Sequence, residues 1–234
     1  MKITIWKKIL SYFFDVQLEK KKSSFSGDLE ILLSRGRIAL CTKNAMYSFD
    51  DLYLNFRTAF SKLNISKINT DKVLLLGAGL LSVPYLLEKN HQKKIKCKAV
   101  DIDPMVLEAA AQYALPRLTS EIELVCADAA AFVLSDGGKY DLIVVDIFID
   151  DTVPTIFEKE NFLESLKNLL SENGLLMYNR MANNDVAFEN TESFYNQIFK
   201  QVFFKSEMLA LKGNCMLLGN YISKSESKDL TVEK

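Results

Sequence analysis

From residue 71 to residue 178 the chain alternates between short apolar runs and longer amphipathic segments. The apolar runs predict five buried strands, at 73–76, 96–101, 123–128, 141–146 and 175–178. Helices are expected between them at 80–89, 104–115 and 158–170. A repeated strand–helix unit forms a parallel sheet with helices on both faces, so the pattern predicts an α/β fold.

The C-terminal part of the chain follows a different pattern. Two strand-like runs, 202–211 and 215–222, flank the turn residues Lys212-Gly213-Asn214. They predict an antiparallel hairpin that closes the sheet. The complete prediction is a Rossmann-like, mostly parallel seven-stranded sheet with an antiparallel C-terminal hairpin.

Before residue 66 the chain predicts a smaller structure. Two short apolar runs, 29–33 and 37–41, are joined by Ser34-Arg35-Gly36 and predict a β-hairpin. Ser48 is expected to cap the helix that follows. We expect three parts along the chain: an N-terminal helix and β-hairpin appendage at 1–65, a nucleoside-binding α/β domain at 66–222 and a flexible tail at 223–234.

Residues 1–14 mix apolar side chains with lysines and predict an amphipathic helix. We expect this helix to pack on its own domain, with a membrane-surface helix or a dimer contact as the alternatives. No apolar run in the chain is long enough to cross a bilayer. The expected compartment is the cytoplasm.

Charge and composition exclude several classes of protein. The chain has 29 Lys and Arg against 30 Asp and Glu, a net charge of −1, and 49% hydrophobic residues. Such a composition is typical of a globular protein and lacks the excess positive charge of a nucleic-acid-binding surface. We therefore expect no nucleic-acid partner.

The cysteines and the single histidine do not predict a metal site. The four cysteines are far apart and form no CxxC pair, and a zinc site needs closely spaced ligands. Cys97 and Cys126 lie in apolar stretches, where we expect buried, reduced thiols. His91 lies in a polar run and is expected at the surface, so we predict no histidine-activated nucleophile.

The predicted strands end in residues that carry chemistry. Gly77-Ala78-Gly79 follows the first strand, Asp101 ends the second, Asp128 ends the third and Asp146 ends the fourth. The carboxyl ends of parallel strands meet at one edge of the sheet, which is where open α/β sheets bind ligands. The glycine turn permits close approach of a ligand to the backbone, and the following helix offers free N–H groups. We therefore expect one site at this edge.

The spacing of these residues predicts a nucleoside pocket. Asp101 can accept hydrogen bonds from the two ribose hydroxyls, and Asp128 can accept one from the exocyclic amine of adenine. A nicotinamide dinucleotide site is the competing hypothesis, although Ser82 stands at the position of its third glycine and it has no need of Asp128. A nucleoside of the S-adenosylmethionine type would contact all three of the strand-end aspartates, Asp101, Asp128 and Asp146.

Four motifs carry a resemblance to a known family. They are Leu76-Gly77-Ala78-Gly79, Val100-Asp101-Ile102-Asp103, Ala127-Asp128-Ala129 and Tyr140 to Asp146. With these motifs the chain resembles the class I methyltransferase fold and, more narrowly, the spermidine synthase family, from about residue 25 to about residue 222. The resemblance also covers the Tyr47-Ser48-Phe49 segment before the glycine turn.

The resemblance implies an aminopropyl transfer from decarboxylated S-adenosylmethionine to a small-molecule amine, with no metal. It implies that Asp146 is the catalytic base, aided by Asp150 or Asp151. The cofactor, S-adenosylmethionine or its decarboxylated form, would be bound by Gly77, Ala78, Gly79, Asp101, Ile102, Asp128, Ala129 and Asp146. The family also implies a homodimer.

The chain departs from the family at residues that would hold the amine. Leu80-Leu81 replaces an aspartate–glycine pair, Phe49 replaces a tyrosine, and Asn44, Ala45 and Met46 stand near the family's acidic residues. Three hypotheses therefore stay open. Aminopropyl transfer comes first, methyl transfer to a small molecule second, and a catalytically silent nucleoside-binding or dimerisation module third.

Overall fold

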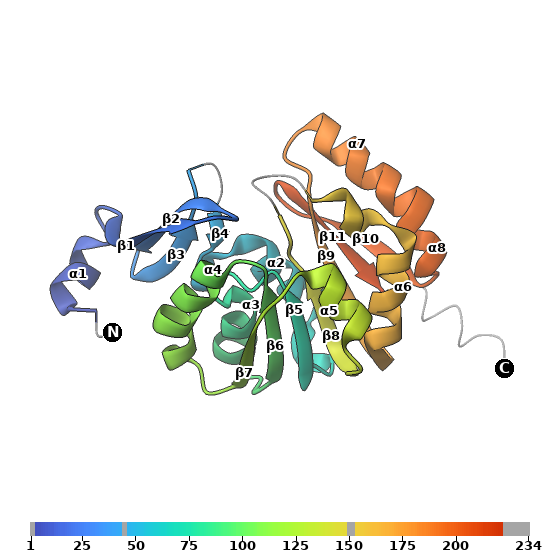
Figure 1. Cartoon of the computed structure of the whole chain (residues 1–234), viewed down its shortest axis with the longest axis horizontal. Coiled ribbons are helices and arrows are strands. Elements are labelled where there is room, and N and C mark those ends of the chain that lie inside the picture. The colour runs from blue at the N-terminus through green and yellow to red at the C-terminus, as the bar shows by residue number, and fades with distance from the viewer. Residues whose placement is uncertain (1–2, 44–45, 149–152, 222–234) are drawn as a thin grey trace.

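The computed structural model describes residues 3–43, 46–148 and 153–221. These residues form a seven-stranded sheet and a four-stranded sheet (Figure 1). Across the large sheet the strands run in the order β10 (Ser206–Ala210), β11 (Asn214–Gly219), β9 (Leu170–Met181), β8 (Tyr140–Val145), β5 (Lys72–Leu76), β6 (Lys96–Asp101) and β7 (Glu121–Cys126). The five strands from β9 to β7 pair in parallel, and β10 and β11 pair antiparallel. The predicted α/β fold with a closing hairpin is confirmed.

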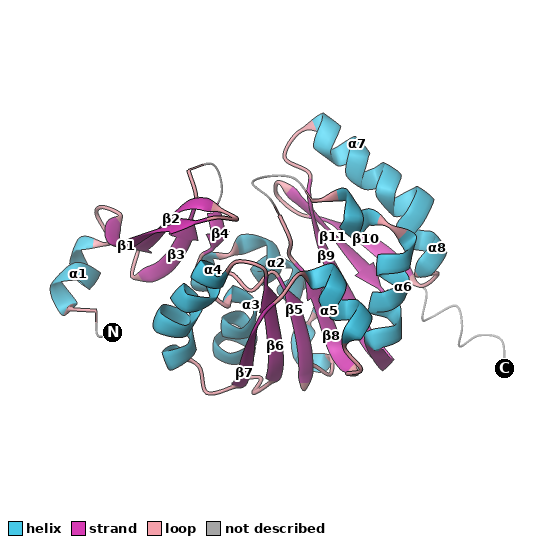
Figure 2. Cartoon of the chain, in the orientation of Figure 1, coloured by secondary structure: helices cyan, strands magenta, loops and turns pink. Residues whose placement is uncertain are grey.

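Helices cover both faces of this sheet (Figure 2). One face packs against α2 (Leu54–Leu63), α3 (Ser82–Tyr85) and α4 (Pro104–Ala109). The other packs against α5 (Ala129–Ser135), α6 (Glu160–Leu169), α7 (Asp185–Phe194) and α8 (Lys200–Val202). Alternate residues of each strand point to opposite faces, so Val73 and Leu75 of β5 enter the first core, while Leu74 and Leu76 enter the second.

Three of the helices widen into π-helical turns before they end. These turns are Leu86–Asn90 after α3, Ala110–Ala114 after α4 and Tyr195–Phe199 after α7. No helix was predicted in the segment 185–202. The predicted strand at 202–211 begins only at Ser206, because Lys200–Val202 completes this helical segment as α8.

The small sheet has the strand order β1 (Val16–Ser23), β2 (Gly27–Ser34), β3 (Arg37–Cys41) and β4 (Met46–Ser48). The predicted hairpin is β2–β3, in which Ser34 pairs with Arg37. Its two turn residues, Arg35 and Gly36, have φ angles of 50° and 73°. Two positive φ angles define the turn type that matches the twist of a two-residue hairpin.

Polar contacts fix the small sheet on the α/β unit. Asp50, in the 3₁₀ turn Asp50–Leu52, is buried and accepts hydrogen bonds of 3.0 and 2.7 Å from Arg117. The hydroxyls of Ser23 and Ser26, at the β1–β2 turn, donate to the buried Asp103 at 2.5 and 2.7 Å. Because both aspartates are buried, these contacts hold the two sheets in one arrangement.

The predicted role of Ser48 is wrong. Helix α2 begins at Leu54 rather than beside Ser48, because the 3₁₀ turn Asp50–Leu52 intervenes. The Ser48 side chain is buried and lies 2.6 Å from the hydroxyl oxygen of Ser82, at the start of α3. It therefore joins the small sheet to the helix after the glycine turn.

Helix α1 (Ile5–Leu10) lies at the outer end of the small sheet (Figure 1) and has no buried residue. Trp6 is 80% exposed and Phe13 is 75% exposed. The expectation that this helix packs on its own domain is wrong, because its apolar side chains face outward. In the part of the chain that the structure describes, no helix is long and apolar enough to cross a membrane.

Candidate active site

The predicted site residues lie at the carboxyl ends of β5, β6, β7 and β8. In the sheet, β5 has β6 on one side and β8 on the other, so the chain order changes direction at β5. Such a change opens a crevice at the ends of the strands, where ligands bind in this class of fold.

The turn after β5 is shaped by Gly77, whose φ angle is 89°. A Cβ atom at this position would lie 2.1 Å from the backbone oxygen of Asp146, so only glycine fits. Gly79 has a φ of 47° and passes close to Tyr47 and Ser48 of β4. The turn is thus held between the end of β8 and the small sheet.

Asp101, at the end of β6, holds the same turn from the other side. Its Oδ2 accepts hydrogen bonds from the backbone N–H groups of Ala78 at 3.0 Å and Gly79 at 3.4 Å, and its Oδ1 accepts one from Asp103 at 3.0 Å. Burial raises the pKa of the Asp101 carboxyl, against the lowering effect of these three N–H groups. A carboxylate oxygen has two lone pairs, so Oδ1 retains one for a ligand, whereas Oδ2 already accepts two hydrogen bonds.

Asp128, just beyond β7, is the N-cap of α5. Its Oδ1 accepts a hydrogen bond of 2.8 Å from the N–H of Ala131, whereas its Oδ2 forms no hydrogen bond with a described residue. Ala129 begins the helix and is buried, and Ile102 is 44% exposed. Asp128 therefore has a structural function, and its proposed contact with adenine stays a prediction.

Asp146, just beyond β8, has two side-chain partners. Its Oδ2 accepts a hydrogen bond of 2.9 Å from the hydroxyl of Tyr53, and its Oδ1 accepts one of 2.9 Å from Nδ2 of Asn179. Asn179 in turn accepts a hydrogen bond of 3.1 Å from Asn214 of β11. Burial raises the pKa of Asp146 to about 6, while the hydrogen bonds from Asn179 and Tyr53 lower it. A carboxyl with this pKa can both take up and release a proton near neutral pH.

Neither partner of Asp146 was predicted from the sequence. Tyr53 immediately precedes α2, four residues after Phe49, and stacks on Phe56 at a ring distance of 5.8 Å. Asn179 directly follows the predicted strand 175–178. Asn179 could have been predicted from the sequence, because a polar residue at the end of a fifth parallel strand reaches the same edge of the sheet.

The leucine pair that replaces the family's aspartate–glycine pair adds no polar group to the site. Leu80 and Leu81 are 1% and 0% exposed and belong to the apolar core. Leu81 adopts a φ of 57°, which costs energy for a residue with a Cβ atom. The predicted catalytic residue Asp150, with Asp151, Asn44 and Ala45, lies outside the described residues.

The cysteine prediction is half right. Cys97 is buried, but Cys126 is exposed, because β7 is the edge strand of the sheet and its last residue is not covered. The Sγ of Cys126 lies 3.9 Å from the backbone oxygen of Ile102.

Among the residues that the structure describes, no three His, Cys, Asp or Glu side chains form a group that could hold a metal ion.

Comparison with known proteins identifies the family. Residues 60–232 match the model of the spermine/spermidine synthase domain. The chain belongs to the spermine/spermidine synthase family. A polyamine aminopropyltransferase of Vibrio vulnificus is 26% identical over 151 residues, which make up 63% of this chain and 50% of the relative. The mouse eEF1A lysine and N-terminal methyltransferase is 29% identical over 117 residues, 46% of this chain and 17% of that protein.

Solved structures share the fold of this family member. A spermidine synthase in complex with the transition-state analogue AdoDATO is similar with a TM-score of 0.69 and 15% identity, over 89% of this chain and 75% of that one. Human methyltransferase-like protein 13 in complex with SAH is similar with a TM-score of 0.56 and 22% identity, over 70% of this chain and 80% of that one. At these identities the likeness supports the class I methyltransferase-like fold. The chain spans half the length of the Vibrio vulnificus relative.

Proposed function

We propose that this family member is a transferase that binds S-adenosylmethionine or its decarboxylated form and transfers an aminopropyl group to a small-molecule amine. The observation that carries the proposal is the Asp146 carboxyl at the end of β8, which has a pKa of about 6 and is oriented by Tyr53 and Asn179. Polyamine aminopropyltransferases among the relatives support the choice of reaction.

The described residues fit the nucleoside half of such a cofactor. Asp101 and Asp128 present carboxylates at the ends of neighbouring strands, and the Oδ2 of Asp128 has no hydrogen bond to a described residue. Gly77 and Gly79 let the turn pack against Asp146 and β4, which brings the backbone N–H groups of Ala78 and Gly79 to Asp101. Acceptors at this spacing suit ribose hydroxyls and an adenine amine. The similar structures bound to AdoDATO and SAH support this assignment.

In the proposed reaction the bound sulfonium supplies a good leaving group beside the carbon that is attacked. Asp146 takes a proton from the substrate ammonium, which leaves the amine nitrogen with a free electron pair. That nitrogen forms a bond to the carbon while the carbon–sulfur bond breaks, and the sulfur keeps the bonding electrons. Tyr53 and Asn179 hold the two carboxylate oxygens and so fix the direction in which Asp146 accepts the proton.

Product analysis tests the proposal directly. The purified protein is incubated with decarboxylated S-adenosylmethionine and putrescine, and methylthioadenosine is measured by mass spectrometry. Asp146→Asn removes the base and is expected to lower the rate by a factor of about 10² to 10⁴. Asp185→Asn is the matched control, because Asp185 is an exposed aspartate of α7. Equal rates in the wild type and Asp146→Asn would remove Asp146 from the mechanism.

Methyl transfer is the second candidate function. It is favoured by the similarity to the eEF1A lysine and N-terminal methyltransferase and by Leu80, which is buried where the family has an acid for the cofactor's amine. With ordinary S-adenosylmethionine and an acceptor, this reaction yields S-adenosylhomocysteine instead of methylthioadenosine. If neither product forms although the nucleoside binds, only the silent binding module is left.

Calorimetric titration tests the assignment of the ribose site. We expect Asp101→Asn to weaken binding of methylthioadenosine about tenfold or more, because a charged acceptor is replaced by a neutral amide that also carries a donor. Asp28→Asn, on the exposed β1–β2 hairpin, is the control. An unchanged affinity in Asp101→Asn would show that Asp101 does not bind the ribose.

We also propose that the chain forms a homodimer, as the family resemblance implies. The exposed apolar side chains of residues 5–14 support this proposal. A second copy would cover them by presenting the same surface, since an interface with two-fold symmetry uses one patch twice.

A further inference from the structure

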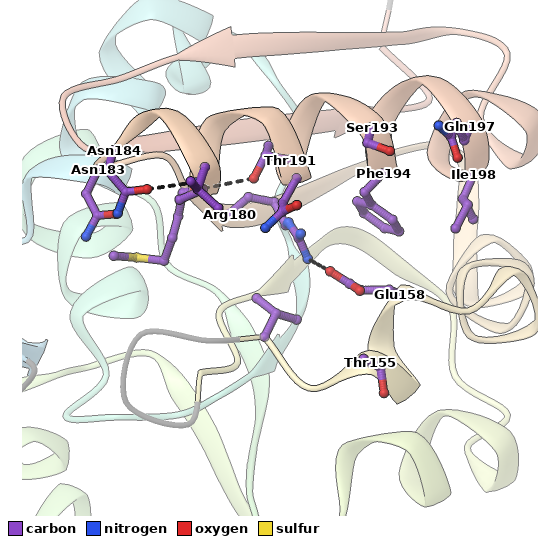
Figure 3. Close-up of a pocket in the computed structure, with 15 residues that line it drawn as sticks. Thr155, Glu158, Arg180, Asn183, Asn184, Thr191, Ser193, Phe194, Gln197 and Ile198 are labelled. Atoms are coloured by element: carbon purple, nitrogen blue, oxygen red, sulfur yellow. Dashed lines mark hydrogen bonds and ion pairs between the residues drawn. The ribbon is translucent and has the colours of Figure 1, made fainter.

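A second site lies on the other side of the sheet from Asp146. A cavity of about 580 Å³ opens between α7 and the 3₁₀ turn Thr155–Glu158 (Figure 3). Arg180 of β9 lines it, and the adjacent Asn179 reaches Asp146. Neighbouring residues of a strand point to opposite faces, so the cavity and Asp146 lie on opposite faces of the sheet. The volume lies within the range of small-molecule sites.

Arg180 is the only cationic side chain among the described residues that line the cavity. It is 5% exposed, and its Nη1 donates a hydrogen bond to Glu158. Its guanidinium lies over the ring of Phe194, with the Cζ atom 4.7 Å from the ring centre. The ion pair and the stacked ring together fix the plane of the guanidinium.

Within the described part of the chain, the edge formed by Nε and Nη2 of Arg180 contacts no carboxylate. The Nε is buried and has no hydrogen-bond partner there, and the hydroxyl of Tyr178 is a second polar neighbour of the guanidinium besides Glu158. Arg37 shows what this edge can do, because its Nε and Nη2 contact the two carboxylate oxygens of Asp51. Leaving a buried donor unpaired costs free energy, so a group that pairs with it gains affinity.

The side chains that line the cavity favour a carboxylate as its ligand. The Nε–Nη2 edge of arginine matches the two oxygens of a planar carboxylate. Glu158 already balances one charge, which favours a monovalent carboxylate group over a phosphate dianion. Asn190 and Ser193 add neutral polar groups, and Val186 and Ala187 add apolar contacts for a carbon chain. We propose that this cavity binds a small organic carboxylate through the Nε and Nη2 groups of Arg180.

Nuclear magnetic resonance on the full chain tests the site. The Nε–H signal of Arg180 is assigned by its loss in Arg180→Lys, and the wild type is titrated with acetate, glutarate and benzoate. We expect at least one carboxylate to shift this signal and the neutral glutaramide to leave it unchanged. Calorimetry with the binding carboxylate should give an affinity at least about tenfold lower in Arg180→Lys, because lysine keeps the charge but loses the planar edge.

Two further variants make the result decisive. Arg57→Lys changes an exposed arginine outside the cavity and should bind the carboxylate like the wild type. Ala187→Phe fills the cavity from α7 without altering Arg180 and should abolish binding even if Arg180→Lys fails to fold. The proposal is overturned if none of the three carboxylates shifts the Nε–H signal, if Ala187→Phe binds normally, or if inorganic phosphate binds more tightly than every carboxylate.

Discussion

At the scale of single residues, the environment of Asp146 differs from what the family pattern implies. Phe49 lacks the hydroxyl of the family's tyrosine, but Tyr53, four residues later, directs its own hydroxyl to Asp146 at 2.9 Å. This hydrogen bond stabilises the ionised form of the carboxyl and so opposes the effect of burial on its pKa. Tyr53 is therefore a positioning residue that also adjusts the pKa of Asp146.

Replacing Tyr53 by phenylalanine tests this role. The pKa of Asp146 should rise above about 6 in Tyr53→Phe, because burial then acts against fewer hydrogen bonds. Activity requires the ionised base, so the acid limb of the profile of kcat/KM against pH should move to higher pH. Tyr140→Phe is the matched control, since it removes a tyrosine hydrogen bond to Asp136 instead. An acid limb at the same pH in Tyr53→Phe and the wild type would refute the role.

The sequence could predict which acids reach the site but not how they are held. Asp101, Asp128 and Asp146 each follow an apolar run, and the rule for parallel strands brings such ends together. The contact between Tyr53 and Asp146 joins residues 93 positions apart. It depends on how the small sheet and α2 pack on the large sheet, and no local pattern records that.

At the scale of elements, the glycine turn and the end of β8 fit tightly together. The backbone N–H of Asp146 donates to the carbonyl of Leu76 at 2.8 Å, and the N–H of Gly77 donates to the carbonyl of Val100 at 2.9 Å. Gly77 thus lies where the carboxyl ends of β5, β6 and β8 are joined by hydrogen bonds. The position of Asp146 depends on this contact as much as on its own hydrogen bonds.

Gly77→Ala tests the contact. The added Cβ atom would meet the backbone oxygen of Asp146 at 2.1 Å, and the φ of 89° is unfavourable for alanine. We expect a loss of about 2 kcal/mol or more in the free energy of unfolding by urea, with weaker nucleoside binding. Gly137→Ala should change little, because a Cβ atom there meets nothing within 4 Å. Equal stability of both variants would mean that the turn tolerates a side chain.

Strand boundaries followed the apolar pattern closely for β5, β6 and β8 but not for β9, which was predicted at 175–178 and spans Leu170–Met181. The predicted range 96–101 matches β6, and β5 and β8 each differ by one residue from prediction. By contrast, β7 starts at Glu121 and ends at Cys126, two residues before prediction, because this edge strand is partly exposed. The strand β1 was missed for the same reason, since its sequence VQLEKKKS is mostly polar.

At the scale of the whole molecule, the apolar surface is unevenly distributed. Seven large apolar side chains in residues 5–14 are exposed, namely Ile5, Trp6, Ile9, Leu10, Tyr12, Phe13 and Phe14. Several exposed apolar side chains in one short segment indicate an interaction site. It lies beyond the small sheet, away from the strand ends that carry Asp101 and Asp146 (Figure 1).

Sedimentation velocity tests the proposed homodimer. We expect the wild type to sediment as a dimer and Trp6→Ser/Phe13→Ser as a monomer, because the substitutions remove two of the most exposed apolar side chains of the segment. Leu134→Ser removes an equally exposed apolar side chain of α5 and should remain dimeric. A monomeric wild type that binds lipid vesicles would instead indicate a membrane-surface helix.

The exposed thiol at the end of β7 lies beside the proposed nucleoside site and is open to covalent labelling. Cys126 lies beside Ile102 and two residues before Asp128, whereas Cys97 and Cys215 are buried. A maleimide dye should therefore react at Cys126 faster than at either buried cysteine. A nucleoside bound between Asp101 and Asp128 would shield this thiol and slow its alkylation. The rate of labelling at Cys126, separated by peptide mapping from that at the partly buried Cys41, thus offers a native reporter of ligand binding.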